Sequence, residues 1–305
     1  MSTIINSKLA GSVVFLTLFF AFLGWLLPDF IRALQIPLLV ILLITIGLPH
    51  GATDYILFRR IKNDNVTNKQ KTKFFVIYVS CILGFLLLWL SFPLSSFLVF
   101  IIISAYHFGQ SNWENTFILK KYKTFVNLMW GAFAIGGSVL WHWAESKIFI
   151  GQVIGFSVNI SSDFMTNVQL ILVAVNCLII LILKIYKFID SNQTLEELGK
   201  IFVLSLLFYH TPMLVGFSIY FALWHSLSSL NNQISFYKKL WPRFSLIDYY
   251  RQAAPFTLLA SAGFVLMIVC HQYILPDVSI ISTFIVFIAC VTLPHIFLVD
   301  ESYQV

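Results

Sequence analysis

The feature that most constrains this chain is the near absence of charged residues over long stretches of its sequence. Of its 305 residues, 59% are hydrophobic and only 10% are charged, whereas an ordinary soluble domain is about 25% charged. A soluble fold of this length needs a polar surface that so few charges cannot supply. The composition therefore predicts an integral membrane protein and argues against a water-soluble enzyme, a nucleic-acid-binding protein or a disordered chain.

The apolar runs have the length of membrane-spanning helices, which need about 20 residues each. We expect one membrane domain over residues 1–305, an all-α bundle of about ten (eight to ten) transmembrane helices. The predicted helices cover residues 9–27, 35–58, 74–92, 94–111, 124–143, 167–186, 195–210, 212–231, 253–273 and 279–299, and the longest polar loops cover 59–73, 144–166 and 232–252. Pro93 separates the third helix from the fourth. Thr211-Pro212, typical of an N-cap and a first helical residue, separates the seventh from the eighth, although one bent helix over 195–231 is an alternative.

The distribution of basic residues predicts the orientation of this bundle. With a cytoplasmic N-terminus and ten crossings, all but Arg32 and Lys147 of the 19 Lys and Arg residues fall in cytoplasmic loops. Cytoplasmic loops of membrane proteins carry such an excess of basic residues. We therefore expect both the N- and the C-terminus to be cytoplasmic.

Four of the seven histidines are predicted to lie at similar depth, each late in a helix that runs toward the cytoplasm. They are His50, His107, His225 and His295. Ionisable groups within a membrane are costly and usually face the bundle interior. A single histidine there is more often a hydrogen-bonded core residue, but imidazoles from several helices can build a metal site. The cysteines form no CxxC pair, so the hypothesis is an all-histidine site, which Fe, Cu, Zn and Ni would all suit.

Several polar side chains near these histidines are candidates to orient the imidazoles. Ligating imidazoles usually donate their second N–H to a carboxylate, a carbonyl or a hydroxyl. Asp54 lies one turn after His50 on the same helical face, and Glu114 ends the polar segment that surrounds His107. The weaker candidates are Tyr55, Tyr106, Gln110 and Ser226. Glu114 could equally be a solvated helix end, and Asp54 a structural hydrogen-bond acceptor.

Four segments of the chain resemble the Brp/Blh family of beta-carotene 15,15'-dioxygenases, which are bacterial and archaeal membrane enzymes linked to rhodopsins. They are GLPHGATDYILF at 47–58, SAYHFGQSNWE at 104–114, YFALWHS at 220–226 and LPHIFLVDE at 293–301. Any one of these segments alone would be a weak signal. The combination of PHG-x-x-D, an HFG segment and WHS is specific, and the resemblance extends over nearly the whole chain.

This resemblance implies a non-haem Fe(II) enzyme that uses O2 to split the central double bond of beta-carotene into two molecules of all-trans-retinal. It also implies a lipid-embedded location in the inner or plasma membrane and a functional link to a retinal-binding rhodopsin. His50, His107 and His225 match the metal ligands that the family implies. Many members have a further histidine four residues after the WHS histidine, where this chain has Ser229. Depth favours His295 as the fourth ligand, with water as the alternative.

Three other functions are weighed against this one. A membrane transporter or binding protein for carotenoid or retinal predicts bound substrate without oxygen-dependent turnover. A haem-b electron carrier would use paired histidines and predicts a haem absorption band. A di-iron desaturase needs clustered HxxxH and HxxHH boxes, whereas the seven histidines here are scattered singly.

Overall fold

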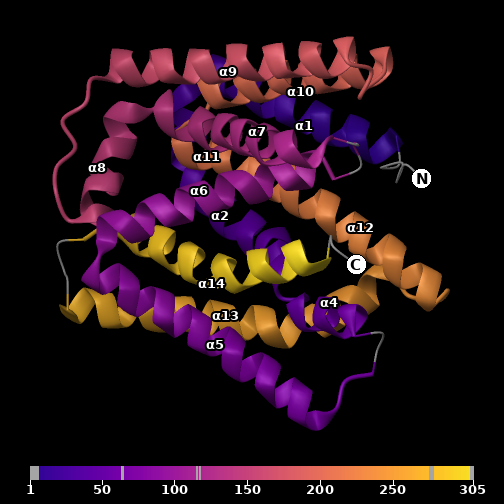
Figure 1. The fold of residues 1–305 in the computed structure, drawn as a ribbon. Coiled ribbons are helices and arrows are strands. Elements are labelled where there is room, and N and C mark those ends of the chain that lie inside the picture. The colour runs from indigo at the N-terminus through magenta and orange to yellow at the C-terminus, as the bar shows by residue number, and fades with distance from the viewer. Residues whose placement is uncertain (1–6, 63–64, 115, 117, 275–277, 303–305) are drawn as a thin grey trace. The chain divides into compact units, whose positions relative to one another are not determined.

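The computed structural model describes residues 7–62, 65–114, 116, 118–274 and 278–302, and in them every regular element is a helix (Figure 1). Eight of the described helices are long and apolar enough to cross a membrane. A ninth span would be a pair of helices bent by 103° at their junction, Lys120–Leu140 and Trp143–Ile154. The chain is therefore an all-α, multi-pass membrane protein, as its sequence predicts.

Packing divides the chain into two compact units. The first comprises Met1–Gly47, Ser104–Ser146 and Asn159–Pro242, and the second comprises Leu48–Ile103, Lys147–Val158 and Arg243–Val305. Two of the boundaries fall inside helices, namely α6 (Pro93–Asn112) and α8 (Trp143–Ile154).

The first unit packs seven α-helices and two π-helices together with the C-terminal half of α6. They are α1 (Ser7–Leu26), α2 (Pro28–Leu42), η1 (Leu43–Gly47), α7 (Lys120–Leu140), α9 (Ser162–Ile185), α10 (Ser191–His210), α11 (Met213–Ile219), η2 (Tyr220–Ser226) and α12 (Leu227–Leu240). Helix α1 packs against α10, and α7 packs against both α9 and α10, which lie side by side (Figure 1). Their shared core is fully buried at Phe133, Leu204 and Phe208.

Buried amide side chains join α9 to α7 within this apolar core. The Gln169 amide donates to the carbonyl of Phe133 at 3.2 Å, and the Asn176 amide donates to the carbonyl of Met129 at 2.9 Å. Where two helices lack a hydrophobic driving force between them, such hydrogen bonds and close packing hold them together.

The second unit is built around α14 (Ile280–Ser302). Its other helices are α3 (Leu48–Gly51), α4 (Asp54–Ile61), α5 (Asn68–Ser91) and α13 (Leu246–Ile274), with the N-terminal half of α6 and most of α8. Helix α14 packs against α4, α5 and α13, and α13 packs against α3. Phe85, Trp89 and Ala289 are buried in its core, where the Trp89 indole N–H donates to the carbonyl of Val153 at 3.3 Å.

Proline marks the helix boundaries that the sequence predicts, with small shifts. Pro93 begins α6, and an extended Thr211 separates α10 from α11, so the single bent helix over 195–231 is excluded. Pro212 is the N-cap of α11 rather than its first residue. The second predicted helix begins at Pro28 instead of residue 35, because proline suits the first helical position and Asp29 suits the positive end of the helix dipole.

The three long polar loops of the prediction are shorter in the structure. Loop 59–73 is shortened because a capping box between Thr67 and Gln70 starts α5 at Asn68, which satisfies two backbone donors. Loop 144–166 contains most of α8, and loop 232–252 contains the end of α12 and the start of α13. Short helices, such as the 12-residue α8, and polar helix ends are missed when only long apolar runs are counted as helices.

Helix α10 exists as predicted, but its N-terminal half is polar, and it is not among the eight candidate spans. Its buried Glu197 accepts from Lys200 at 2.6 Å and from the Asn112 amide at 3.0 Å. Eight spans would leave both ends of the chain on one side of the membrane, as ten would, whereas nine would not. The cytoplasmic assignment of these ends stays a prediction.

We expect Gly131→Ala and Gly109→Ala to destabilise the first unit. A Cβ at position 131 would collide with the backbone of Ala105, and a Cβ at position 109 with the backbone of Asn127. Overpacking of this kind costs about 1–3 kcal/mol, so the midpoint of thermal unfolding in detergent should fall by several degrees. Gly199→Ala is the control, since nothing lies within 4 Å of its Cβ. Equal midpoints in the three variants would contradict close α6–α7 packing.

Candidate metal centre

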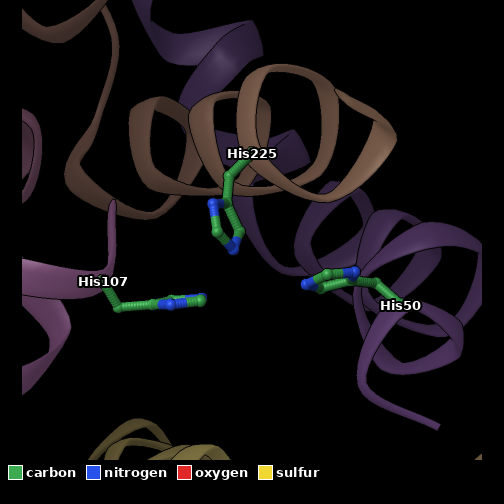
Figure 2. A group of neighbouring side chains, drawn as sticks. All are labelled: His50, His107 and His225. Atoms are coloured by element: carbon green, nitrogen blue, oxygen red, sulfur yellow. The ribbon is translucent and has the colours of Figure 1, made fainter. Parts of the chain in front are cut away.

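A pair of buried histidines lies in the first unit, one from α6 and one from η2. The rings of His107 and His225 have centroids 4.9 Å apart and are inclined by 75°. Each ring offers a nitrogen within 4.8 Å of a nitrogen of the other, and Figure 2 shows the two imidazoles directed toward each other. Both side chains are at most 5% exposed. Two neighbouring imidazoles in an apolar interior could supply two of the four ligands of a tetrahedral metal site.

A π-helix presents His225. The segment Tyr220–Ser226 forms η2, and the Leu227 N–H donates to the carbonyl of Ala222, five residues earlier. Single-turn π-helices are rare and occur frequently at functional sites. The WHS segment of the sequence therefore lies in a backbone conformation that is typical of a functional position.

Aromatic rings enclose His225 within the same unit. Phe108 meets its imidazole edge-on at 4.7 Å, and Phe221 stacks on it at 5.9 Å with the planes inclined by 22°. Phe221 itself depends on Gly47, because a Cβ at position 47 would lie 2.7 Å from the Phe221 ring. These contacts hold the imidazole in one orientation and surround it with apolar carbon.

A second pair of buried histidines lies in the second unit. The rings of His50, in α3, and His295, in α14, have centroids 4.9 Å apart. Nδ1 of His295 lies 2.7 Å from Oδ1 of Asp54, and the other carboxylate oxygen accepts from the Tyr78 hydroxyl at 2.7 Å. A carboxylate on Nδ1 fixes the tautomer of a histidine and leaves Nε2 as its metal-binding atom.

The other predicted orienting residues are distributed over both units. Gln110 and Ser226 are buried and follow His107 and His225 closely in the sequence, and Tyr106 is half-buried. Glu114 accepts from the Asn232 amide at 3.3 Å. Tyr55 lies instead among aromatic rings, including Phe75 at 5.1 Å. The structure thus brings Asp54 to a histidine, while Glu114 and Tyr55 contact other groups.

Three residues that contact Asp54 or the backbone at Pro49 and His50 were not predicted from the sequence. Tyr78 binds Asp54, and the hydroxyls of Thr53 and Tyr249 reach the backbone at His50 and Pro49. Thr53 could have been suspected, since threonine often bonds a carbonyl three or four residues earlier. Tyr78 and Tyr249 lie far along the chain from the residues they contact, and no local pattern points to them.

Two of the remaining histidines take part in other contacts. Nε2 of His142 lies 2.8 Å from the carbonyl of Phe208, so it links the α7–α8 junction to α10. His210 ends α10 and meets Tyr209 edge-on at 5.1 Å. Neither belongs to the two histidine pairs.

The donor chemistry of both pairs fits a divalent transition metal. Imidazole nitrogen binds Fe, Zn, Cu and Ni, and burial in apolar surroundings excludes competing water. The Asp54–His295 contact is the kind of carboxylate–imidazole bond that raises the basicity of a ligating histidine. His50, His107, His225 and His295 could therefore each bind a metal.

The sequence matches a family model described as beta-carotene 15,15'-dioxygenase over residues 41–301. It is also similar to a beta-carotene 15,15'-dioxygenase of the uncultured marine bacterium 66A03, with 23% identity over 273 residues, which cover 86% of this chain and 92% of the relative. No solved structure matches it significantly. Because the family model spans most of the chain, including both histidine pairs, the chain belongs to the beta-carotene 15,15'-dioxygenase family.

Proposed function

We propose that this protein cleaves the central 15,15' double bond of beta-carotene with O2 and releases two molecules of all-trans-retinal. One C=C bond is broken and two C=O bonds form, so one O2 supplies both oxygen atoms and no external reductant is required. The observation that carries the proposal is the presence of two buried histidine pairs in a membrane protein of this family. Beta-carotene is an apolar polyene that dissolves in the bilayer, where such an enzyme meets it directly.

The proposed cofactor is a single Fe(II) ion held by His50, His107, His225 and His295. The first three are the residues drawn in Figure 2. His295 would bind through Nε2, because its Nδ1 faces Asp54, and it would take the place of the histidine that Ser229 replaces in sequence. When bound, the iron would activate O2 beside the alkene.

The protein's own residues contribute orientation and exclusion of water. Asp54 would hold the proton on Nδ1 of His295 and so fix the tautomer of that ligand. Phe108 and Phe221 fix the ring of His225 and keep water from it. A dry, apolar surrounding favours an apolar substrate and strengthens each polar interaction within the site.

We further propose that the protein resides in the inner or plasma membrane, with lipid as its immediate surroundings, and supplies retinal to a retinal-binding rhodopsin. Retinal is itself apolar and would leave through lipid rather than through water. A carotenoid or retinal transporter and a haem-b carrier are the competing functions that the following experiments separate.

Expression of the chain in carotene-producing cells should bleach their orange colour and yield retinal. A His107→Ala strain should stay orange, because one of the proposed iron ligands is missing. Liquid chromatography of cell extracts would quantify beta-carotene and retinal, in cultures grown with and without oxygen. Accumulation of intact carotene on the purified protein, without retinal, would identify a binding protein or transporter instead. A haem absorption band on the purified protein would identify an electron carrier.

Alanine at His50, His107 or His225 should abolish iron binding and retinal production, and His295→Ala should do the same if it is the fourth ligand. Iron per purified protein is the measurement. His142→Ala is the matched control, since His142 bonds a backbone carbonyl, and it should keep its iron. Full iron content in His295→Ala would assign the fourth position to water.

Asp54→Asn should weaken Fe(II) binding about 10- to 100-fold, the usual effect of removing a partner of a ligating histidine. The amide keeps the size of the carboxylate but loses its charge and its capacity to accept two hydrogen bonds through equivalent oxygens. Asp163→Asn, in the exposed first turn of α9, should leave Fe(II) affinity unchanged. Equal affinities in the two variants would mean that Asp54 does not support a ligand.

A further inference from the structure

The backbone that carries His50 is irregular on both sides of the histidine. The π-helix η1 ends at Gly47, α3 covers only Leu48–Gly51, and a turn at Ala52 and Thr53 precedes α4. Each break interrupts the regular hydrogen-bond ladder of a helix. Within a membrane such irregular backbone is tolerated only where side chains or neighbouring helices satisfy the freed groups.

Two hydroxyl groups bind the carbonyls at this break. The Thr53 hydroxyl donates to the carbonyl of His50 at 2.9 Å. The Tyr249 hydroxyl, from the first turn of α13, donates to the carbonyl of Pro49 at 3.3 Å. The two hydroxyl oxygens lie 3.4 Å from each other, so the carbonyls of two successive residues are held by one pair of side chains.

Both hydroxyl-bearing side chains are completely buried. Thr53 and Tyr249 are 0% exposed, and His50 is 4% exposed. In apolar surroundings a hydrogen bond is stronger than in water, and its loss leaves a carbonyl that water cannot reach. The bonds therefore constrain the peptide units on both sides of the His50 Cα, which set the direction of its Cα–Cβ bond.

We propose that Thr53 and Tyr249 are positioning residues that hold the broken helix in the conformation that directs His50 toward the metal. Asp54, which contacts His295, begins α4 immediately after Thr53, so the same two hydroxyls set the position of that carboxylate. This role rests on the proposed function only for the identity of the ion. The restraint on the backbone is independent of it.

The test compares Thr53→Val and Tyr249→Phe, each of which removes one hydroxyl and keeps the size of the side chain. Each should weaken Fe(II) binding by the metal-free protein about tenfold, measured by titration, while Thr53→Ser should retain wild-type affinity. The double variant should lose less than the product of the two single losses, because the hydroxyls act on one segment.

The chain offers a matched control for each variant on α13. Thr257→Val removes a hydroxyl bond to the Ala253 carbonyl in regular helix, and Tyr273→Phe removes the hydroxyl of a tyrosine that is 86% exposed. Both controls should bind Fe(II) as the wild type does. A loss in Thr257→Val equal to that in Thr53→Val would overturn the proposal, because general destabilisation would then explain both.

Amide hydrogen exchange supplies a readout that does not depend on the metal. In metal-free Thr53→Val and Tyr249→Phe, residues 51–57 should exchange faster, while α5 and α14 exchange as in the wild type. Unchanged exchange in residues 51–57 would overturn the proposal. Failure of the wild type to bind Fe(II) would refute the proposed function, and the exchange result would still decide whether the two hydroxyls restrain this backbone.

Discussion

A polar group placed among hydrocarbon must find its partners within the protein, and the structure depends on how this requirement is met. Water cannot solvate a buried amide, carboxylate or imidazole at membrane depth, and each unsatisfied group costs several kcal/mol. In the first unit Gln169 and Asn176 meet the requirement by bonding carbonyls of α7. The same physics that makes polar residues costly thus makes them strong and specific links between helices.

Asp54 is the most demanding case, because an isolated carboxylate in apolar surroundings is unstable. Both of its oxygens are engaged, one by Nδ1 of His295 and the other by the hydroxyl of Tyr78. Pairing each oxygen of a buried carboxyl group with a partner is what makes its burial tolerable. Asp54 lies one turn after His50 but contacts His295 of α14. The reason is the turn at Ala52 and Thr53, which breaks the helical face that His50 and Asp54 would otherwise share.

The sequence was sufficient for those parts of the structure that depend on local patterns. The length of the apolar runs predicted a membrane protein. Pro93 and Thr211-Pro212 predicted helix boundaries, because proline lacks a backbone N–H and is tolerated better at the start of a helix than in its interior. The start of α5 was misplaced because Thr67 and Gln70 extend the helix through a polar stretch. The four histidines were predicted as ligands from residue type and predicted depth, and that role stays a prediction. Tyr78 and Tyr249 could not be, because their contacts join segments far apart in the chain.

The π-helices explain why helical periodicity could not predict which way the histidines face. A π-turn closes its hydrogen bond one residue later than an α-turn, so each π-segment rotates the residues that follow it relative to a regular helix. Both η1 and η2 lie within the first unit and pack against each other, and there Gly47 leaves the space that the Phe221 ring occupies beside His225. The glycine of the GLPHG segment and the phenylalanine of the YFALWHS segment are therefore coupled by packing. Within this unit, these motif residues lie on two π-helices that pack against each other, and not on regular helices.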